Sequence, residues 1–244
     1  MHPLSAHNIL QVWERGYDQH LVNRALTLLT ATCQEMTWNE LAELSVGQRD
    51  ALLLALREQT FGTRLNVFTE CPQCHESIEF TTDTADIRVV NRYDPAENEN
   101  ELSVENFDLR FRLINSLDLA SIINCDDVTK ARSILVHRCV IQVSREGVEL
   151  SPKELPEDII EKLITRMAEC DPQSDVLLNI MCPACTHNWD MIFDIVSFFW
   201  TEISMQAKRL LHEVHTLALA YGWREADILS MSTARRQLYL EMVS

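Results

Sequence analysis

The sequence is poor in glycine, with five among 244 residues, and this scarcity excludes several kinds of site. Glycine-rich loops let the backbone approach phosphate groups closely, yet neither GxGxxG nor GxxxxGK[ST] occurs. The GxSxG turn that presents a nucleophilic serine is also absent. We therefore expect neither a nucleotide-binding loop nor a serine hydrolase, and the low glycine count also argues against a long, loop-rich β-architecture.

Long hydrophobic runs are missing as well. The most apolar window, Met191–Ile203, contains Asp194 and Glu202 and is too short to span a membrane. The opening "MHPLSAHNILQVWERGYDQH" has no basic segment followed by an apolar core, so no secretory signal is expected. We expect the chain in the cytoplasm of the producing cell, where its eight cysteines favour metal ligands and buried thiols over disulfides.

Positive charge is in short supply. Lys and Arg number 21 against 37 Asp and Glu, which gives a formal net charge of −16. Such a chain repels phosphate backbones, so we expect no nucleic-acid partner. The excess charge favours solubility or docking to a basic protein surface. Hydrophobic residues at 46% indicate a globular protein.

Catalytic motifs are not evident. The segment "HEVH" at His212–His215 resembles a metalloprotease helix, but the position that needs the second histidine holds Thr216. We interpret His212 and Glu213 as ordinary residues of a helix surface. No nucleophile with a matching base stands out, so we expect no enzymatic activity.

Two short motifs carry the strongest signal. Cys71 and Cys74 lie in "NVFTECPQCHESIEFTT", and Cys182 and Cys185 lie in "NIMCPACTHNWDMIF". Each pair encloses two residues of which the first is proline, and strand-like alternation flanks each pair. We therefore predict two hairpins, each with a CPxC turn.

Four thiolates from two such turns match the tetrahedral shell that Zn²⁺ prefers. Since a closed shell leaves no position for water or substrate, the predicted zinc is structural. The alternatives are two unrelated pairs or a redox dithiol, and the long separation of the two pairs speaks against a compact ribbon. We favour one shared zinc, with His75 and His187 as neighbours of the ligands or exposed residues. Cys33, Cys125, Cys139 and Cys170 are expected to be buried thiols.

Helical patterns surround these hairpins. Residues 5–60 show helical spacing, with capping boxes at Thr37–Glu40 and Ser45–Gln48 and a stop at Gly62. Between the hairpins, the acidic stretch 91–106 is expected to be an exposed loop, and strands and helices follow it.

The predicted fold class is α+β, with mainly helical N- and C-terminal regions around a four-cysteine zinc ribbon that carries an inserted α+β segment. The predicted divisions are a helical region at 1–64, a ribbon formed by 65–83 and 174–195, an inserted α+β segment at 84–173, and a helical region at 196–244.

The segments "FGTRLNVFTECPQCHESIEF", "CPACTHNWDMIFDIVSFFW", "LLHEVHTLALAYGWREADILSM" and "RRQLYLEMV" resemble the T4-type baseplate protein family of contractile phage tails and contractile injection systems. The resemblance covers both cysteine pairs and most of the C-terminal half. It implies a non-enzymatic role in baseplate hub assembly, as an assembly chaperone or a minor component, with baseplate or hub proteins as partners. It also allows retention in the assembled particle.

A different hypothesis is a zinc-ribbon adaptor that binds host transcription or translation machinery. The residues around the cysteine pairs include Glu70, Glu76, Glu79 and Asp190, which disfavour direct contact with nucleic acid.

Overall fold

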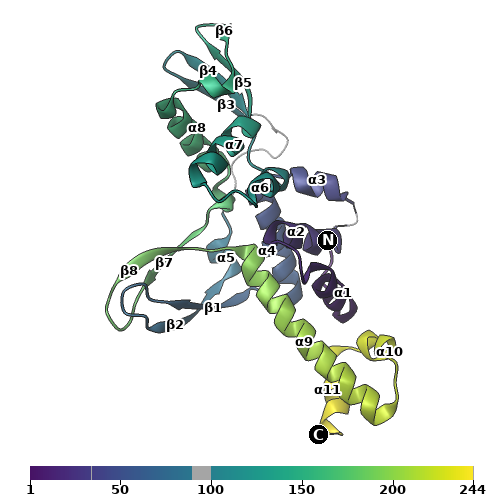
Figure 1. The fold of residues 1–244 in the computed structure, drawn as a ribbon. Coiled ribbons are helices and arrows are strands. Elements are labelled where there is room, and N and C mark those ends of the chain that lie inside the picture. Colours follow the sequence, from purple (N-terminus) through teal and green to yellow (C-terminus); the bar gives the residue numbers. More distant parts are fainter. Residues whose placement is uncertain (34, 90–99, 244) are drawn as a thin grey trace.

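The computed structural model describes residues 1–33, 35–89 and 100–243. Helices and small antiparallel sheets make up the chain, which agrees with the predicted α+β class. Figure 1 shows three parts: a central group of helices, two hairpins projecting to one side, and a small α+β unit at the end opposite the C-terminus.

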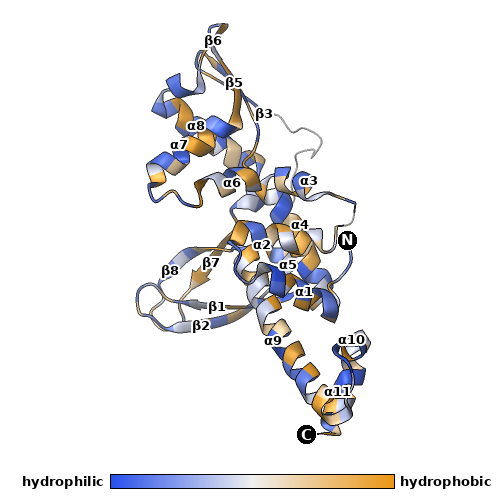
Figure 2. Ribbon diagram, turned by 45° about the vertical axis from the view of Figure 1, so that its right-hand side comes forward, coloured by the Kyte–Doolittle hydropathy of each residue, from blue (hydrophilic) through white to orange (hydrophobic). Residues whose placement is uncertain are grey.

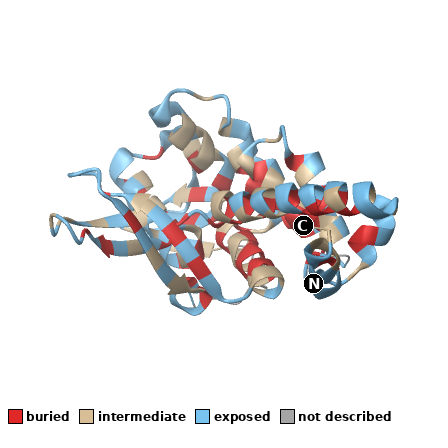
Figure 3. Cartoon of the chain, turned by 90° about the horizontal axis from the view of Figure 1, so that it is seen from below, coloured by how far each residue is buried: buried red, intermediate tan, exposed pale blue. Residues whose placement is uncertain are grey.

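The central helices are α1 (Ala6–Gly16), α2 (Leu21–Thr30), α3 (Trp38–Glu43) and α4 (Val46–Phe61). Helices α1, α2 and α4 pack on the long helix α9 (Ile195–Tyr221), and α3 packs on α2. The shared core includes Leu26, Leu53 and Phe199. Buried and exposed residues alternate along the helices in Figure 3, so each helix turns one side to the interior.

The predicted helix boundaries in this part are confirmed. Ser45 caps α4 and forms a capping box with Gln48, and Thr37 does the same with Glu40 at α3. Helix α4 ends at Gly62, whose φ of +89° lies in the region that glycine adopts without strain.

The two hairpins follow the predicted period of two. Strand β1 (Arg64–Glu70) pairs antiparallel with β2 (Ser77–Asp83), and β7 (Leu177–Met181) pairs with β8 (Asn188–Ile192). Figure 1 shows the hairpins side by side, and their facing sides bury Ile78 and Ile180. Short helix α5 (Thr84–Ile87) follows β2.

The α+β unit occupies most of the chain between the hairpins. Its antiparallel sheet has the order β3 (Asn100–Val104), β4 (Phe107–Phe111), β5 (Val140–Arg145) and β6 (Val148–Glu149). Helices α6 (Ser116–Ile122), α7 (Val128–Cys139) and α8 (Glu157–Cys170) and the 3₁₀ turns η1 (Pro152–Glu154) and η2 (Pro172–Ser174) complete it. Its separate apolar core includes Phe111, Ile159 and Leu163.

The expected loop at 91–106 is wrong in its second half. Strand β3 covers Asn100–Val104, because Leu102 and Val104 pack on the second core and pair with β4. Residues 91–99 of that stretch lie outside the described residues.

The C-terminal part continues along α9, on which polar and apolar residues alternate in Figure 2. Gly222, with φ +67°, ends α9, and α10 (Glu225–Ser230) and α11 (Thr233–Glu241) fold back on it. Within the described ranges, none of the helices has the length and apolar character that a membrane crossing requires.

Glu213 is not the surface residue that the sequence suggested. Its side chain is buried, and its carboxylate accepts hydrogen bonds from the guanidinium groups of Arg209 and Arg236 at 3.0 and 2.9 Å. Arg236 belongs to α11 and is itself buried. The pair therefore links α11 to α9.

Candidate metal centre

The tips of the two hairpins bring all four predicted cysteines together. The Sγ atoms of Cys71, Cys74, Cys182 and Cys185 all lie within 4.8 Å of one another. Cys71 and Cys185 are 3.7 Å apart, and Cys74 and Cys182 are 3.6 Å apart, although each pair joins residues more than a hundred positions apart. The gap between the motifs therefore does not prevent a shared site.

These separations can be compared with the geometry of zinc. Four Zn–S bonds of about 2.3 Å directed to the corners of a regular tetrahedron place the sulfurs about 3.8 Å apart. The separations of 3.7 and 3.6 Å lie near that value. A disulfide needs sulfurs at about 2 Å, and none of the eight cysteines, all of which lie within the described residues, forms one. The donor set thus fits a four-coordinate metal ion.

The two turns have the same backbone structure. The N–H of Cys71 donates to the carbonyl of Glu76 at 2.9 Å, and the N–H of Cys182 donates to the carbonyl of His187 at 2.8 Å. One residue after the second cysteine, His75 and Thr186 have φ of 59° and 60°. This left-handed conformation is unfavourable for residues other than glycine. Neither position holds glycine, so the sequence gives no sign of this repeated feature.

Backbone amides and burial shape the chemistry of the thiols. Burial raises the pKa of Cys71, but the N–H groups of Cys74 and Gln73 and the neighbouring thiols lower it to about 7. At Cys74, the N–H of Glu76 lowers the pKa, but the thiol of Cys185, burial and the other two thiols raise it to about 12. Without metal, Cys74 therefore keeps its proton at neutral pH, and a bound cation displaces it.

The four cysteines differ in their exposure to solvent. Cys71 and Cys182, the first cysteine of each turn, are fully buried, whereas Cys74 is exposed. Ile78 and Ile180 pack beside the buried pair, with Trp189 partly covering it. The first cysteines are thus held in the packed interior, whereas Cys74 is exposed and Cys185 is half-buried.

The two nearby histidines lie outside the four-sulfur cluster. The ring of His75 is exposed and its Nδ1 lies 2.8 Å from the carboxylate of Glu70. The ring of His187 stacks on Trp189 with centroids 5.9 Å apart. Neither belongs to the group of residues whose atoms could share one ion, although His187 contributes its backbone carbonyl to the second turn.

The other cysteines have unrelated surroundings. Cys139 and Cys170 are buried as expected, whereas Cys33 and Cys125 are only half-buried, which departs from the expectation. Burial and the charge of Asp118 raise the pKa of the Cys139 thiol to about 12. This thiol is therefore protonated at neutral pH and is a poor nucleophile.

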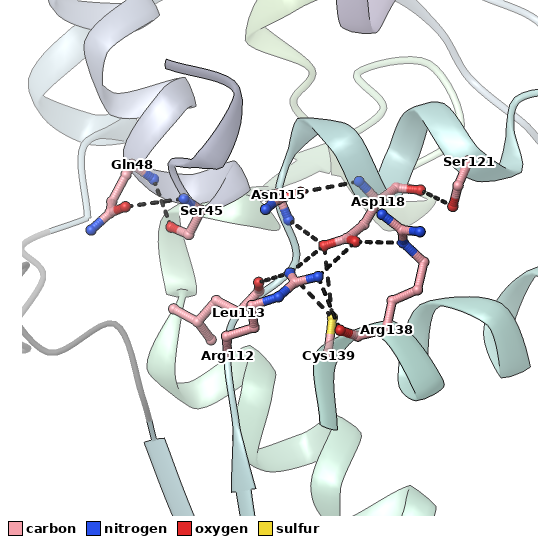
Figure 4. A network of polar contacts seen from close by, with 9 residues as sticks. All are labelled: Ser45, Gln48, Arg112, Leu113, Asn115, Asp118, Ser121, Arg138 and Cys139. Carbon is pink, nitrogen blue, oxygen red and sulfur yellow. Dashed lines mark hydrogen bonds and ion pairs between the residues drawn. The ribbon is translucent and has the colours of Figure 1, made fainter. Parts of the chain in front are cut away.

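Asp118 itself is the centre of a polar network within the α+β unit (Figure 4). Its carboxylate is fully buried and accepts hydrogen bonds from the guanidinium groups of Arg112 and Arg138 and from the N–H of Asn115. Burial opposes ionisation, yet these donors lower the pKa of Asp118 below its usual value. Since every oxygen is occupied by a donor, the network is suited to joining β4, α6 and α7.

The chain matches one known protein family over most of its length. A family model described as "T4 bacteriophage base plate protein" matches residues 6–200, which include both hairpins, the α+β unit and the start of α9. No curated protein and no solved structure shows a significant match to the chain.

Proposed function

The chain belongs to the T4 bacteriophage base plate protein family, and on this premise we propose that it acts, without enzymatic activity, as a hub assembly factor or minor component of a contractile-tail baseplate. Membership of this family supports a general role in baseplate structure or assembly. The specific role in hub assembly rests on the resemblance of the cysteine motifs and the C-terminal segments. The same role in a contractile injection system is part of the proposal.

The proposal includes a structural zinc ion held by Cys71, Cys74, Cys182 and Cys185. The observation that supports it is the approach of four sulfurs from two hairpins to within 4.8 Å. Zinc would clamp two segments that are distant in sequence, and closing so long a loop costs conformational entropy that metal binding offsets. In this view 65–83 and 174–195 form one zinc ribbon, 84–173 is inserted in it, and 1–64 and 196–244 are the flanking helical regions.

The proposed partners are baseplate or hub proteins in the cytoplasm of the producing cell, with retention in the particle if the chain is a component. Charge supports a protein partner, because a net charge of −16 disfavours nucleic acid. The rival role, a zinc-ribbon adaptor for host transcription or translation machinery, requires the same metal but different partners.

The decisive experiment separates lysate of the producing cell by size and quantifies this chain and bound zinc in every fraction by mass spectrometry. A fixed ratio to tail proteins within particles would establish a baseplate component. Presence only in smaller complexes with baseplate proteins would establish an assembly chaperone. Recovery with ribosomes or polymerase, and without tail proteins, would overturn the proposal in favour of the adaptor.

A further inference from the structure

An apolar groove lies where the α+β unit meets the central helices. It has a volume of about 570 Å³ and runs between α6, α7 and α8. Leu119, Ile122, Leu135 and Ile164 form its walls, and all four remain only half-buried in the single chain. Val128, at its mouth, is 82% exposed. The chain thus leaves an aliphatic surface in contact with water.

A second depression continues this surface on the other side of α6. It measures about 290 Å³, and Leu119 and Ile122 line it as they line the first groove. Ile123 and Val196 extend its apolar lining toward α2 and α9. The two depressions therefore form one elongated apolar surface that crosses α6, a shape suited to an extended or helical segment rather than a compact small molecule.

Cations on this surface are already paired. The guanidinium group of Arg132, in the first groove, is shared by the carboxylates of Glu157 and Glu161. That of Arg49, in the second depression, pairs with Asp50 at 2.8 Å.

Several carboxylates on or beside this surface form no ion pair within the described residues, although the guanidinium group of Arg49 lies near Asp171. Asp171 lines the first groove and Asp194 the second, and both are held by hydroxyl groups and backbone N–H groups. Asp126 and Asp127 immediately precede Val128 and are exposed, and within the described residues neither forms an ion pair. Lys130 is the one further cation on this turn of α7. The apolar surface is therefore bordered by excess negative charge.

We propose that this groove docks an amphipathic segment of a partner protein that inserts apolar side chains and places Lys or Arg beside the acidic border. Apolar burial supplies affinity, and the uncompensated carboxylates select a basic partner over an acidic one. The inference concerns the chemistry of the partner and does not depend on the zinc site or on the baseplate role.

The test uses the full-length chain and two short fluorescent helical peptides with identical leucine positions, one with lysine and one with glutamate at the polar positions. Fluorescence anisotropy at low salt measures both affinities. The lysine peptide is expected to bind at least about tenfold more tightly than the glutamate peptide, and added salt is expected to reduce the difference.

Substitutions locate the binding. Ala168 lines the groove on α8 and is exposed, so Ala168→Trp fills the groove with little cost to the fold, and it should weaken the lysine peptide about tenfold or more. The matched control is Ala220→Trp on the exposed side of α9, which should bind as the natural chain does. Asp126→Lys should weaken the lysine peptide without filling the groove.

Equal affinity for both peptides, or undiminished binding by Ala168→Trp, would overturn the proposal. Two further measurements identify other occupants. If neither peptide binds but the neutral dye Nile red does, in a manner lost in Ala168→Trp, the groove takes small hydrophobic molecules instead. If sedimentation velocity shows self-association that Ala168→Trp abolishes and no peptide binds, the occupant is a second copy of the chain.

Discussion

The carboxylate of Asp171 accepts a hydrogen bond from the backbone N–H of Gly47 at 2.9 Å, although 124 positions separate the two residues. It also accepts one from the hydroxyl of Ser45, the N-cap of α4, at 3.0 Å. A carboxylate is stabilising at this end of a helix, where backbone N–H groups lack partners. Since Asp171 lies between α8 and β7, it ties the start of α4 to the segment that enters the second hairpin.

Gly47→Ala should destabilise the chain by about 1–3 kcal/mol, because the added Cβ would lie 2.1 Å from Oδ1 of Asp171. In an ordinary helix interior the same change gains about 0.5–1 kcal/mol, so the sign alone is informative. Urea unfolding of both chains measures the difference.

The control for this prediction is the same change in an Asp171→Ala background. Removing the carboxylate removes the clash, so Gly47→Ala should cost much less there. An equal cost in both backgrounds would show that the approach of Asp171 is not the reason for glycine at this position.

Cys182→Ser should lose bound zinc and much of its stability. The side chain is fully buried in the four-sulfur cluster, and structural zinc contributes on the order of 10 kcal/mol in small domains. Zinc per chain by mass spectrometry and thermal unfolding by circular dichroism measure both effects. Cys125→Ser, a change of a half-buried thiol outside the cluster, serves as the control and should retain zinc. Full zinc content in Cys182→Ser would contradict the proposed ligand set.

Zinc affinity should fall as the pH falls. With the pKa of Cys74 raised to about 12 and that of Cys185 also raised, the metal must displace protons from the thiols. We expect zinc binding to release protons near pH 7. Titration calorimetry in buffers of different ionisation enthalpy counts these protons. An affinity that does not change between about pH 6 and about pH 8 would refute the proposed thiol chemistry.

Asp118→Asn should cost about 3 kcal/mol at neutral pH, because it leaves Arg112 and Arg138 without their buried carboxylate. The folded pKa of Asp118 lies below its unfolded value of about 3.9, so its contribution is complete above that value and is lost as the pH falls through the folded pKa. The difference between the two chains should therefore shrink in strong acid. Urea unfolding over a pH series tests this, and a difference independent of pH would contradict it.

Glu213→Ala should release α11 from α9. The change leaves the guanidinium group of Arg236 buried without its carboxylate, which costs about 3–5 kcal/mol for such pairs. Hydrogen exchange should show lost protection in α11 and the end of α9. The neighbouring exposed His212→Ala provides the control and should leave exchange unchanged. Unchanged protection in Glu213→Ala would show that packing alone holds α11.

Local features of the fold could be predicted from the sequence. The capping boxes at Thr37 and Ser45, the stop at Gly62 and the hairpins around the cysteine pairs each depend on residues within a few positions. The approach of the two cysteine pairs was also predictable, because matching motifs imply a common ion.

Long-range pairings could not be predicted in this way. Glu213 pairs with Arg236, and Asp171 accepts a hydrogen bond from Gly47. No sequence spacing identifies these partners, because the chain has many other acidic, basic and backbone groups with which each could pair. Strand β3 was hidden because its polar residues alternate with only two apolar residues, Leu102 and Val104, which need β4 to form a sheet. Tertiary context decides such segments.

The separation of the two cysteine turns has a consequence for synthesis. Cys74 and Cys182 are 108 positions apart, so a ribosome adding about 5–20 residues per second makes the first turn roughly 5–20 s before the second. During that interval the first pair of thiols has no partners. The four-sulfur cluster can therefore form only after the whole α+β unit has been synthesised. A chain that terminates before Cys182 would have only the first pair of cysteines.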